Sequence, residues 1–244
     1  VYASSTRQLL QLHDALADTQ IFSLLARHCV LTRLTYVQRT IVPEHQARAA
    51  SAFDVLMRHA FQVSHHLAPL DDAARMQLAL PLRSGGAGWV PSAPALPRCY
   101  VASALAAMDA LCDVSTGWRR TMLALAEEIA ADAAGTLLYP LPPHADALVA
   151  AHADLLAAIP AARRTAAGYS AELVGNLGNT AHLQRRLGHA DAAHRHQQLR
   201  ELIATRRIAC ARELRRASAA VRASSPDAAG DDFDDEVLGR AIHA

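Results

Sequence analysis

Hydrophobic residues recur along this chain at intervals of three and four positions, which is the spacing of one face of an α-helix. The first clear run with this spacing consists of Ile21, Leu24, Leu25, His28 and Cys29. Asp18 and Thr19 lie just upstream, where a side-chain oxygen can cap the first turn of a helix. A similar stripe continues over residues 34–41 until Pro43, because proline disfavours further helix at and before its own position. The pattern predicts a helix whose buried face carries these residues.

The same reasoning predicts helices along most of the remaining chain. Pro43 suits the first turn of a helix, with Glu44 near the positive end of its dipole. The buried stripe of that helix is expected to be Phe53, Leu56, Met57, Ala60 and Phe61. Further helices are expected over residues 71–80, 94–111, 117–134, 144–159 and about 189–222. Strand signals are almost absent, so the sequence predicts an all-α fold of helical bundles.

One segment, QLALPLRSGGAGWVPSA at residues 77–93, breaks the helical pattern. Its proline ends the preceding helix, its three glycines permit positive φ or close backbone approach, and its aromatic residue can hold the turn against a core. These structural residues are Pro81, Gly85, Gly86, Gly88 and Trp89. Leu80 and Leu82 are expected to pin the turn in the same way. Gly175, Gly178 and Gly188 are expected at later helix ends and turns.

These breaks predict four parts. Residues 1–68 form a first helical unit, 69–93 a connector with the glycine-rich turn, 94–222 a second helical unit with a basic final helix, and 223–244 an acidic tail.

The composition fits this scheme and adds a charge asymmetry. Of the residues, 52% are hydrophobic and 5% are aromatic, and the net charge is only +1. All 24 basic residues are arginine, a bias expected of GC-rich coding. Residues 184–222 hold ten arginines against three acids, a balance of +7, whereas residues 223–244 hold six acids against one arginine, a balance of −5. The overall neutrality is therefore a cancellation between two neighbouring segments.

Several classes of protein are disfavoured. The four cysteines lack CxxC spacing, so neither a disulfide framework nor a zinc knuckle is indicated. No leader and no apolar run of about 18 residues is present, so we expect no membrane partner and an intracellular protein. Because residue 1 is Val, the chain is expected to be a piece of a longer polypeptide. His182, His189, His194 and His196 lie in a histidine-rich stretch without HExxH spacing, and surface histidines are preferred to a metal site.

Two stretches carry a family resemblance. LPLRSGGAGWVPSA followed by CYVASAL resembles the LPLR-x-GG-x-G segment and the alanine-rich helix start that lie downstream of the polymerase core in LINE-type (non-LTR) retrotransposon reverse transcriptases. TQIFSLLARHCVLTRLTYVQRTIVPEH and AFDVLMRHAF are similar to the helices that precede that segment. The resemblance covers about Leu9 to Leu105, with departures at Thr32, Ala87 and Trp89.

The resemblance implies a non-catalytic fragment of an RNA-directed DNA polymerase. Residues 1–68 would correspond to the helical thumb, and the catalytic carboxylates and their Mg²⁺ would belong to the missing palm of the parent polypeptide. The partners would be that palm, an RNA template and a DNA primer, bound without sequence specificity, and the location would be nuclear. The acidic run DDFDDEV at residues 231–237 is expected to be a solvated tail, so no residue of this chain is assigned a catalytic role and no cofactor is assigned to it.

Arginine is the residue type that would contact phosphates in such a fragment, since a copying enzyme must accept every base sequence. Arg27, Arg33 and Arg39 are spaced by six residues and are expected to line one groove wall. A second candidate set forms a basic stripe on the final helix: Arg206, Arg207, Arg212, Arg215 and Arg216. The acidic tail could instead cover that stripe, or water alone could surround it.

Two other functions stay open. The chain could be a helical protein-interaction scaffold derived from such an element, without nucleic-acid binding, or an enzyme of another kind. No GxSxG motif or Cys/His pairing favours the enzyme.

Overall fold

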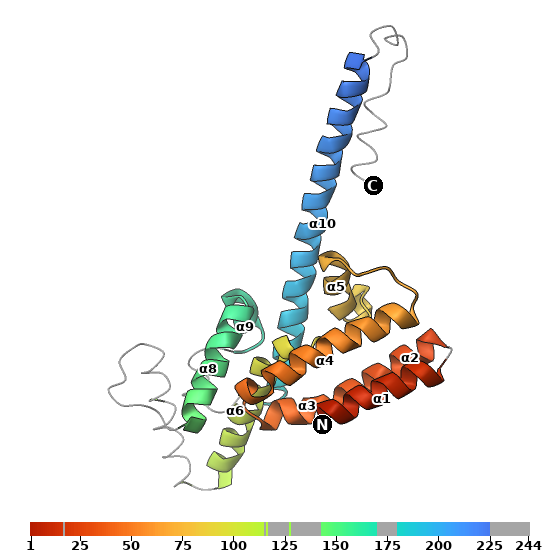
Figure 1. Cartoon of the computed structure of the whole chain (residues 1–244). Coiled ribbons are helices and arrows are strands. Elements are labelled where there is room, and N and C mark those ends of the chain that lie inside the picture. The colour runs from red at the N-terminus through yellow and green to blue at the C-terminus, as the bar shows by residue number, and fades with distance from the viewer. Residues whose placement is uncertain (17, 115, 117–126, 128–142, 170–179, 225–244) are drawn as a thin grey trace. The chain divides into compact units, whose positions relative to one another are not determined.

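The computed structural model describes residues 1–16, 18–114, 116, 127, 143–169 and 180–224. Every regular element within these ranges is helical and none is a strand, which confirms the predicted all-α fold (Figure 1). Contacts divide the chain into a first unit, residues 1–196, and a second unit, residues 197–244. The predicted helix over residues 117–134 lies outside the described residues except for residue 127, and the acidic run and the glycines at 175 and 178 lie outside them entirely.

The first half of the first unit holds the helices up to the glycine-rich turn. They are α1 (Tyr2–Ala15), α2 (Thr19–Leu25), the π-helical turn η1 (Ala26–Val30), α3 (Leu31–Thr40), α4 (Pro43–Ser64) and α5 (Asp72–Ala79). The later elements are the 3₁₀ turns η2 (Leu82–Ser84) and η3 (Ala93–Ala95), then α6 (Leu96–Val114), α8 (Pro143–Ala158), α9 (Ala161–Ala166) and α10 (Leu183–Ser224). α10 is continuous across the boundary between the two units.

The predicted helix starts agree with the structure. Asp18 caps α2, where its Oδ1 accepts hydrogen bonds from the backbone N–H groups of Gln20 and Ile21 at 2.8 and 3.0 Å. Pro43 occupies the first turn of α4, as expected from its fixed φ and its missing N–H. The expected buried stripe of α4 is also present, with Phe53, Met57, Ala60 and Phe61 buried and Leu56 partly buried.

The buried face predicted for residues 21–29 is wrong. Ile21 and Leu24 are 46% and 51% exposed, and the buried residues are Phe22, Ala26 and Val30. These three follow the i, i+4, i+8 spacing of another face of the helix, and that face is buried because Phe22 packs against Trp89. The chain forms a π-helical turn here, in which the N–H of Leu31 bonds to the carbonyl of Ala26 five residues back.

The first unit contains two hydrophobic cores. The first joins the helices before the turn: Leu9, Phe22, Ala26, Val30, Leu34, Phe53, Met57, Ala60, Phe61, Leu78 and Trp89. The second joins α6, α8 and the start of α10: Val101, Ala102, Leu105, Leu148, Ala151, Leu155, Ile159, Ala167, Tyr169, Leu183, Leu187 and Ala190. α6 packs against both α3 and α8, so it links the two cores.

The glycine-rich turn folds back over the C-terminal end of α5. The N–H groups of Ala87 and Trp89 donate to the carbonyl of Leu78, and the N–H of Gly88 donates to the carbonyl of Leu80 at 2.8 Å. These bonds satisfy carbonyls that a helix end leaves without partners. Pro81 follows the last residues of α5 and starts the reversal, where its carbonyl accepts from Gly86 at 3.2 Å.

The three glycines of the turn serve different purposes. Gly85 and Gly88 have φ of +75° and +72°, a conformation that favours glycine. Gly86 lacks a positive φ, but a Cβ there would lie 2.1 Å from the carbonyl oxygen of Leu80. The turn therefore needs glycine at two positions for conformation and at one for close approach.

Trp89 anchors the turn in the first core. It is 1% exposed and its ring packs against Phe61 and Phe22, with centroids 4.9 and 5.9 Å apart. Leu80 is fully buried, whereas Leu82, which was expected to pin the turn as well, is 60% exposed. After the turn, the carboxylate of Asp54 on α4 accepts hydrogen bonds from the N–H groups of Ser92 and Ala93 at 2.6 and 2.9 Å. The exit of the turn is thus held by α4.

The start of the final helix differs from the prediction. α10 begins at Leu183 rather than near residue 189, and Gly188 lies inside it instead of in a turn. Leu183 and Leu187 explain the earlier start, because both are buried in the second core at helical spacing.

Candidate anion-binding site

A cavity of about 560 Å³ lies within the first unit. Its wall comes from η1 and α3, from the residues after the glycine-rich turn, from α6 and from the first turns of α10. Among the described residues, four arginines line it, and we refer to them as the cavity arginines: Arg27, Arg39, Arg98 and Arg185. No aspartate or glutamate is among the described residues that line this cavity. The site is therefore built for a negatively charged group.

The glycine-rich turn contributes to the position of Arg27. A Cβ added to Gly88 would lie 3.1 Å from Cδ of Arg27, so the arginine stem lies against the bare backbone of the turn. The Arg27 guanidinium also donates from Nε and Nη2 to Nε2 of His28, at 3.3 and 3.0 Å. Gly88 thus provides both the sharp reversal of the chain and the space that Arg27 occupies.

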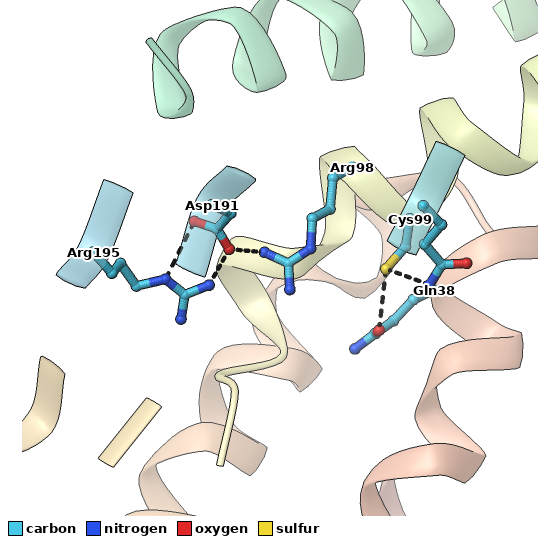
Figure 2. Close-up of polar contacts among 6 residues, drawn as sticks. Gln38, Arg98, Cys99, Asp191 and Arg195 are labelled. Atoms are coloured by element: carbon cyan, nitrogen blue, oxygen red, sulfur yellow. Dashed lines mark hydrogen bonds and ion pairs between the residues drawn. The ribbon is translucent and has the colours of Figure 1, made fainter. Parts of the chain in front are cut away.

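Arg98 is fixed by a buried ion cluster that joins α6 to α10 (Figure 2). The carboxylate of Asp191 lies between the guanidinium groups of Arg98 and Arg195 and bonds to both. Nε of Arg195 donates a further bond to Oδ1 of Asp191 at 3.2 Å. The three side chains are only 11–15% exposed, so the attraction between them is weakly screened by water.

A second set of polar contacts lies beside this cluster and again joins α3, α6 and α10. The thiol of Cys99 donates to Oε1 of Gln38 at 3.7 Å (Figure 2). Its sulfur accepts from Nε2 of Gln184 at 3.2 Å. Burial raises the pKa of the Cys99 thiol, so it stays protonated as a donor. These contacts hold the cavity wall together, since both glutamines also line it.

The charge around the cavity is unbalanced. Behind the lining, Asp191 is bonded to two arginines, and Asp109 accepts a hydrogen bond from Thr180 at 2.6 Å. The carboxylate of Asp54 is bonded in the same way to Ser92, another residue of the lining. Among the described residues, counting these three carboxylates against the cavity arginines and Arg195 gives five positive and three negative charges, a surplus of two with histidine neutral. An anion entering the cavity would offset this surplus.

The three arginines expected on one wall do not all share it. Arg27 and Arg39 line the cavity, but Arg33 lines a separate pocket with residues of α1, including Gln8 and Gln11. A step of six residues turns a side chain by about 240° around an α-helix, so a single shared face was not to be expected. The predicted common wall is therefore wrong for Arg33.

The second candidate set lies on the part of α10 that belongs to the second unit. We refer to these residues as the α10 arginines: Arg206, Arg207, Arg212, Arg215 and Arg216. All five are exposed. At about 100° per residue they spread around the whole circumference of the helix rather than along one stripe. Polyanions approaching from any side would meet guanidinium groups.

Sequence reasoning did not identify Arg98 and Arg185 as site residues, nor the ion pairs of Asp191 with Arg98 and Arg195. One signal was present, because Arg98 and Asp109 are the only charged residues in the alanine-rich stretch 96–111. A charge in such a helix needs a partner when it is buried, and both residues have one. The identity of those partners depended on the tertiary fold.

Neither a metal centre nor a membrane span is found in the described part of the chain. No group of three or more His, Cys, Asp or Glu side chains there could hold a metal ion. No helix in the same ranges is long and apolar enough to cross a bilayer.

The comparisons with known proteins identify no relative. No family model, no curated protein and no solved structure matches this chain.

Proposed function

We propose that this chain is a non-catalytic helical part of a LINE-type reverse transcriptase and that it holds the template and primer backbone through arginine–phosphate contacts. The observation that carries the proposal is the exposed arginine-rich part of α10, in a chain with a net charge of only +1. The sequence resemblance over residues 9–105 supplies the polymerase context.

The physical basis is the release of counterions from nucleic acid. Each guanidinium that neutralises a phosphate frees condensed cations, which favours binding at low salt regardless of base sequence. Guanidinium groups also match phosphate oxygens with paired N–H donors. Five exposed arginines on one helix are suited to this role, because their side chains can follow a backbone without reading bases.

The proposal assigns no chemical step to this chain. Polymerisation and its Mg²⁺ would belong to the palm of the parent polypeptide, and no ligand for that ion is assigned here. The contribution of this part would be to hold the duplex beside the palm, with the palm and the nucleic acid as its two partners.

The experiment is a binding titration of an RNA/DNA hybrid of about 20 base pairs, followed by fluorescence anisotropy. We expect binding that weakens steeply as salt rises and that is the same for two hybrids of unrelated sequence. A variant with all five α10 arginines changed to glutamine should bind at least about tenfold more weakly, since it loses several charged hydrogen bonds. An absence of binding at low salt, or an affinity independent of salt, would contradict the proposal.

A helical interaction scaffold is the alternative function, and one observation favours it. Ile203, Ile208 and Leu214 on α10 are 39%, 53% and 58% exposed, so apolar side chains of this helix are accessible to a partner. Under this alternative, changing these three residues to glutamine would abolish the interaction with a protein partner. Neither the native chain nor the triple variant would then bind nucleic acid. Retained hybrid binding in that triple variant would favour the first proposal.

A further inference from the structure

We infer that the cavity binds the 5′-phosphate of a nucleotide, either free or at the end of a strand, as a site separate from the duplex-binding α10 arginines. The inference deepens the proposed function, on which it rests for the class of ligand. The cavity has the size of a small-molecule site, since about 300–1,000 Å³ is typical of such sites and its volume is about 560 Å³. A duplex is too wide for it, whereas one nucleotide fits.

The charge of the cavity favours a terminal phosphate over a phosphodiester. A phosphodiester carries one negative charge, while a phosphomonoester at neutral pH carries about 1.5 to 2. The surplus of two positive charges around the site is offset better by the more highly charged group. Arg39 and Arg185 are exposed at the cavity, so their guanidinium groups are accessible to an entering ligand.

The ion pair of Arg98 with Asp191 explains how the site keeps its shape. Asp191 and the wall formed by α6 hold Arg98, so this side chain loses little conformational freedom when a ligand binds. Arg27 is similarly confined by Gly88 and His28. The site thus combines two positioned guanidinium groups with two accessible ones.

The remaining lining suits a sugar and a base. Leu31, Val90, Pro91 and Leu183 supply apolar surface, and Thr32 and Thr35 supply hydroxyl groups. A ligand that carried a phosphate alone would leave this part of the wall uncovered. We therefore expect a nucleoside phosphate to bind more tightly than inorganic phosphate.

The test is isothermal titration of the full 244-residue chain with AMP, adenosine, inorganic phosphate and two tetranucleotides that differ only in a 5′-phosphate. We expect AMP to bind, adenosine not to bind, and phosphate to bind more weakly than AMP. Arg39→Gln combined with Arg185→Gln should weaken AMP binding by about tenfold or more, because two charged hydrogen-bonding groups are removed. Arg33→Gln is the matched control, since it lies on the same helix as Arg39 but lines another pocket, and it should leave AMP binding unchanged.

The different ligands separate the possible sources of the phosphate. Binding of the phosphorylated tetranucleotide, with the same weakening in the double variant, assigns the site to strand ends, and binding of AMP alone assigns it to a free nucleotide. Equal binding of adenosine and AMP, an equal weakening in Arg33→Gln, or no binding of AMP would overturn the inference. Failure of the proposed function is distinguishable, because hybrid binding would then be absent while AMP binding persists.

Discussion

The cavity arginines and the α10 arginines carry the same charged group in two different structural settings. Around the cavity, Arg98 and Arg27 are held by contacts with residues that are distant in sequence or by the bare backbone of a glycine. On α10, the five arginines are exposed side chains of one helix. The first setting is suited to a ligand of defined shape, and the second to an extended polyanion of any sequence.

The largest expected effect is a loss of stability when the ion cluster beside the cavity is broken. Asp191→Ala would leave Arg98 and Arg195 buried without their shared carboxylate, which typically costs about 3–5 kcal/mol. Urea unfolding followed by circular dichroism would measure this decrease. Asp72→Ala is the control, because its ion pair with Arg75 is solvent-exposed and is worth less than about 1 kcal/mol. Similar small decreases in both variants would mean that the cluster does not hold the cavity wall.

A smaller loss of stability is expected for substitutions in the glycine-rich turn, where Gly88 lies against Arg27. Gly86→Ala places a Cβ 2.1 Å from the Leu80 carbonyl oxygen, so the turn must shift, at a cost of about 1–3 kcal/mol. Gly85→Ala meets no atom within 4 Å and costs only the left-handed backbone conformation, about 1 kcal/mol. Thermal unfolding of the two variants should therefore rank Gly86→Ala as the less stable. The reverse order would contradict the close approach at Gly86.

Thiol reactivity compares the two regions directly, since each contains a cysteine. Cys99 is buried at the cavity, and its raised pKa lowers the thiolate fraction, whereas Cys210 on α10 is exposed. In variants that retain only Cys99 or only Cys210 of the four cysteines, we expect Cys99 to react with a thiol reagent at pH 8 at least about tenfold more slowly than Cys210. Urea should abolish the difference. Equal rates in the folded proteins would show that the cavity wall opens readily.

The smallest expected effect is an increase in stability. Gly188 lies within α10 and nothing lies within 4 Å of a Cβ added there, so Gly188→Ala should stabilise the chain by about 0.5–1 kcal/mol. Chemical denaturation would measure the change. A decrease in stability would instead support the turn that the sequence alone predicted at this position.

Local signals in the sequence predicted most of the helices. The site could not be predicted in the same way, because it depends on contacts between residues that are distant in the sequence. Asp18 and Pro43 act on their own helix starts, so their roles are visible in a few neighbouring letters. Phe22 lies on a face that also has helical spacing, and its burial depends on packing against Trp89, a residue distant in the sequence. Arg98 and Asp191 meet although 93 positions separate them, and only the packing of α6 against α10 brings them together.

The salt dependence of hybrid binding tests the central claim most directly, because it reports how many phosphates the protein neutralises. The slope of log affinity against log salt should be steep in the native protein. When the five α10 arginines become glutamine, the slope should fall by up to about 0.9 for each phosphate that is no longer neutralised. The Arg39→Gln and Arg185→Gln double variant should change this slope less. An unchanged slope and affinity in the five-arginine variant would contradict the account.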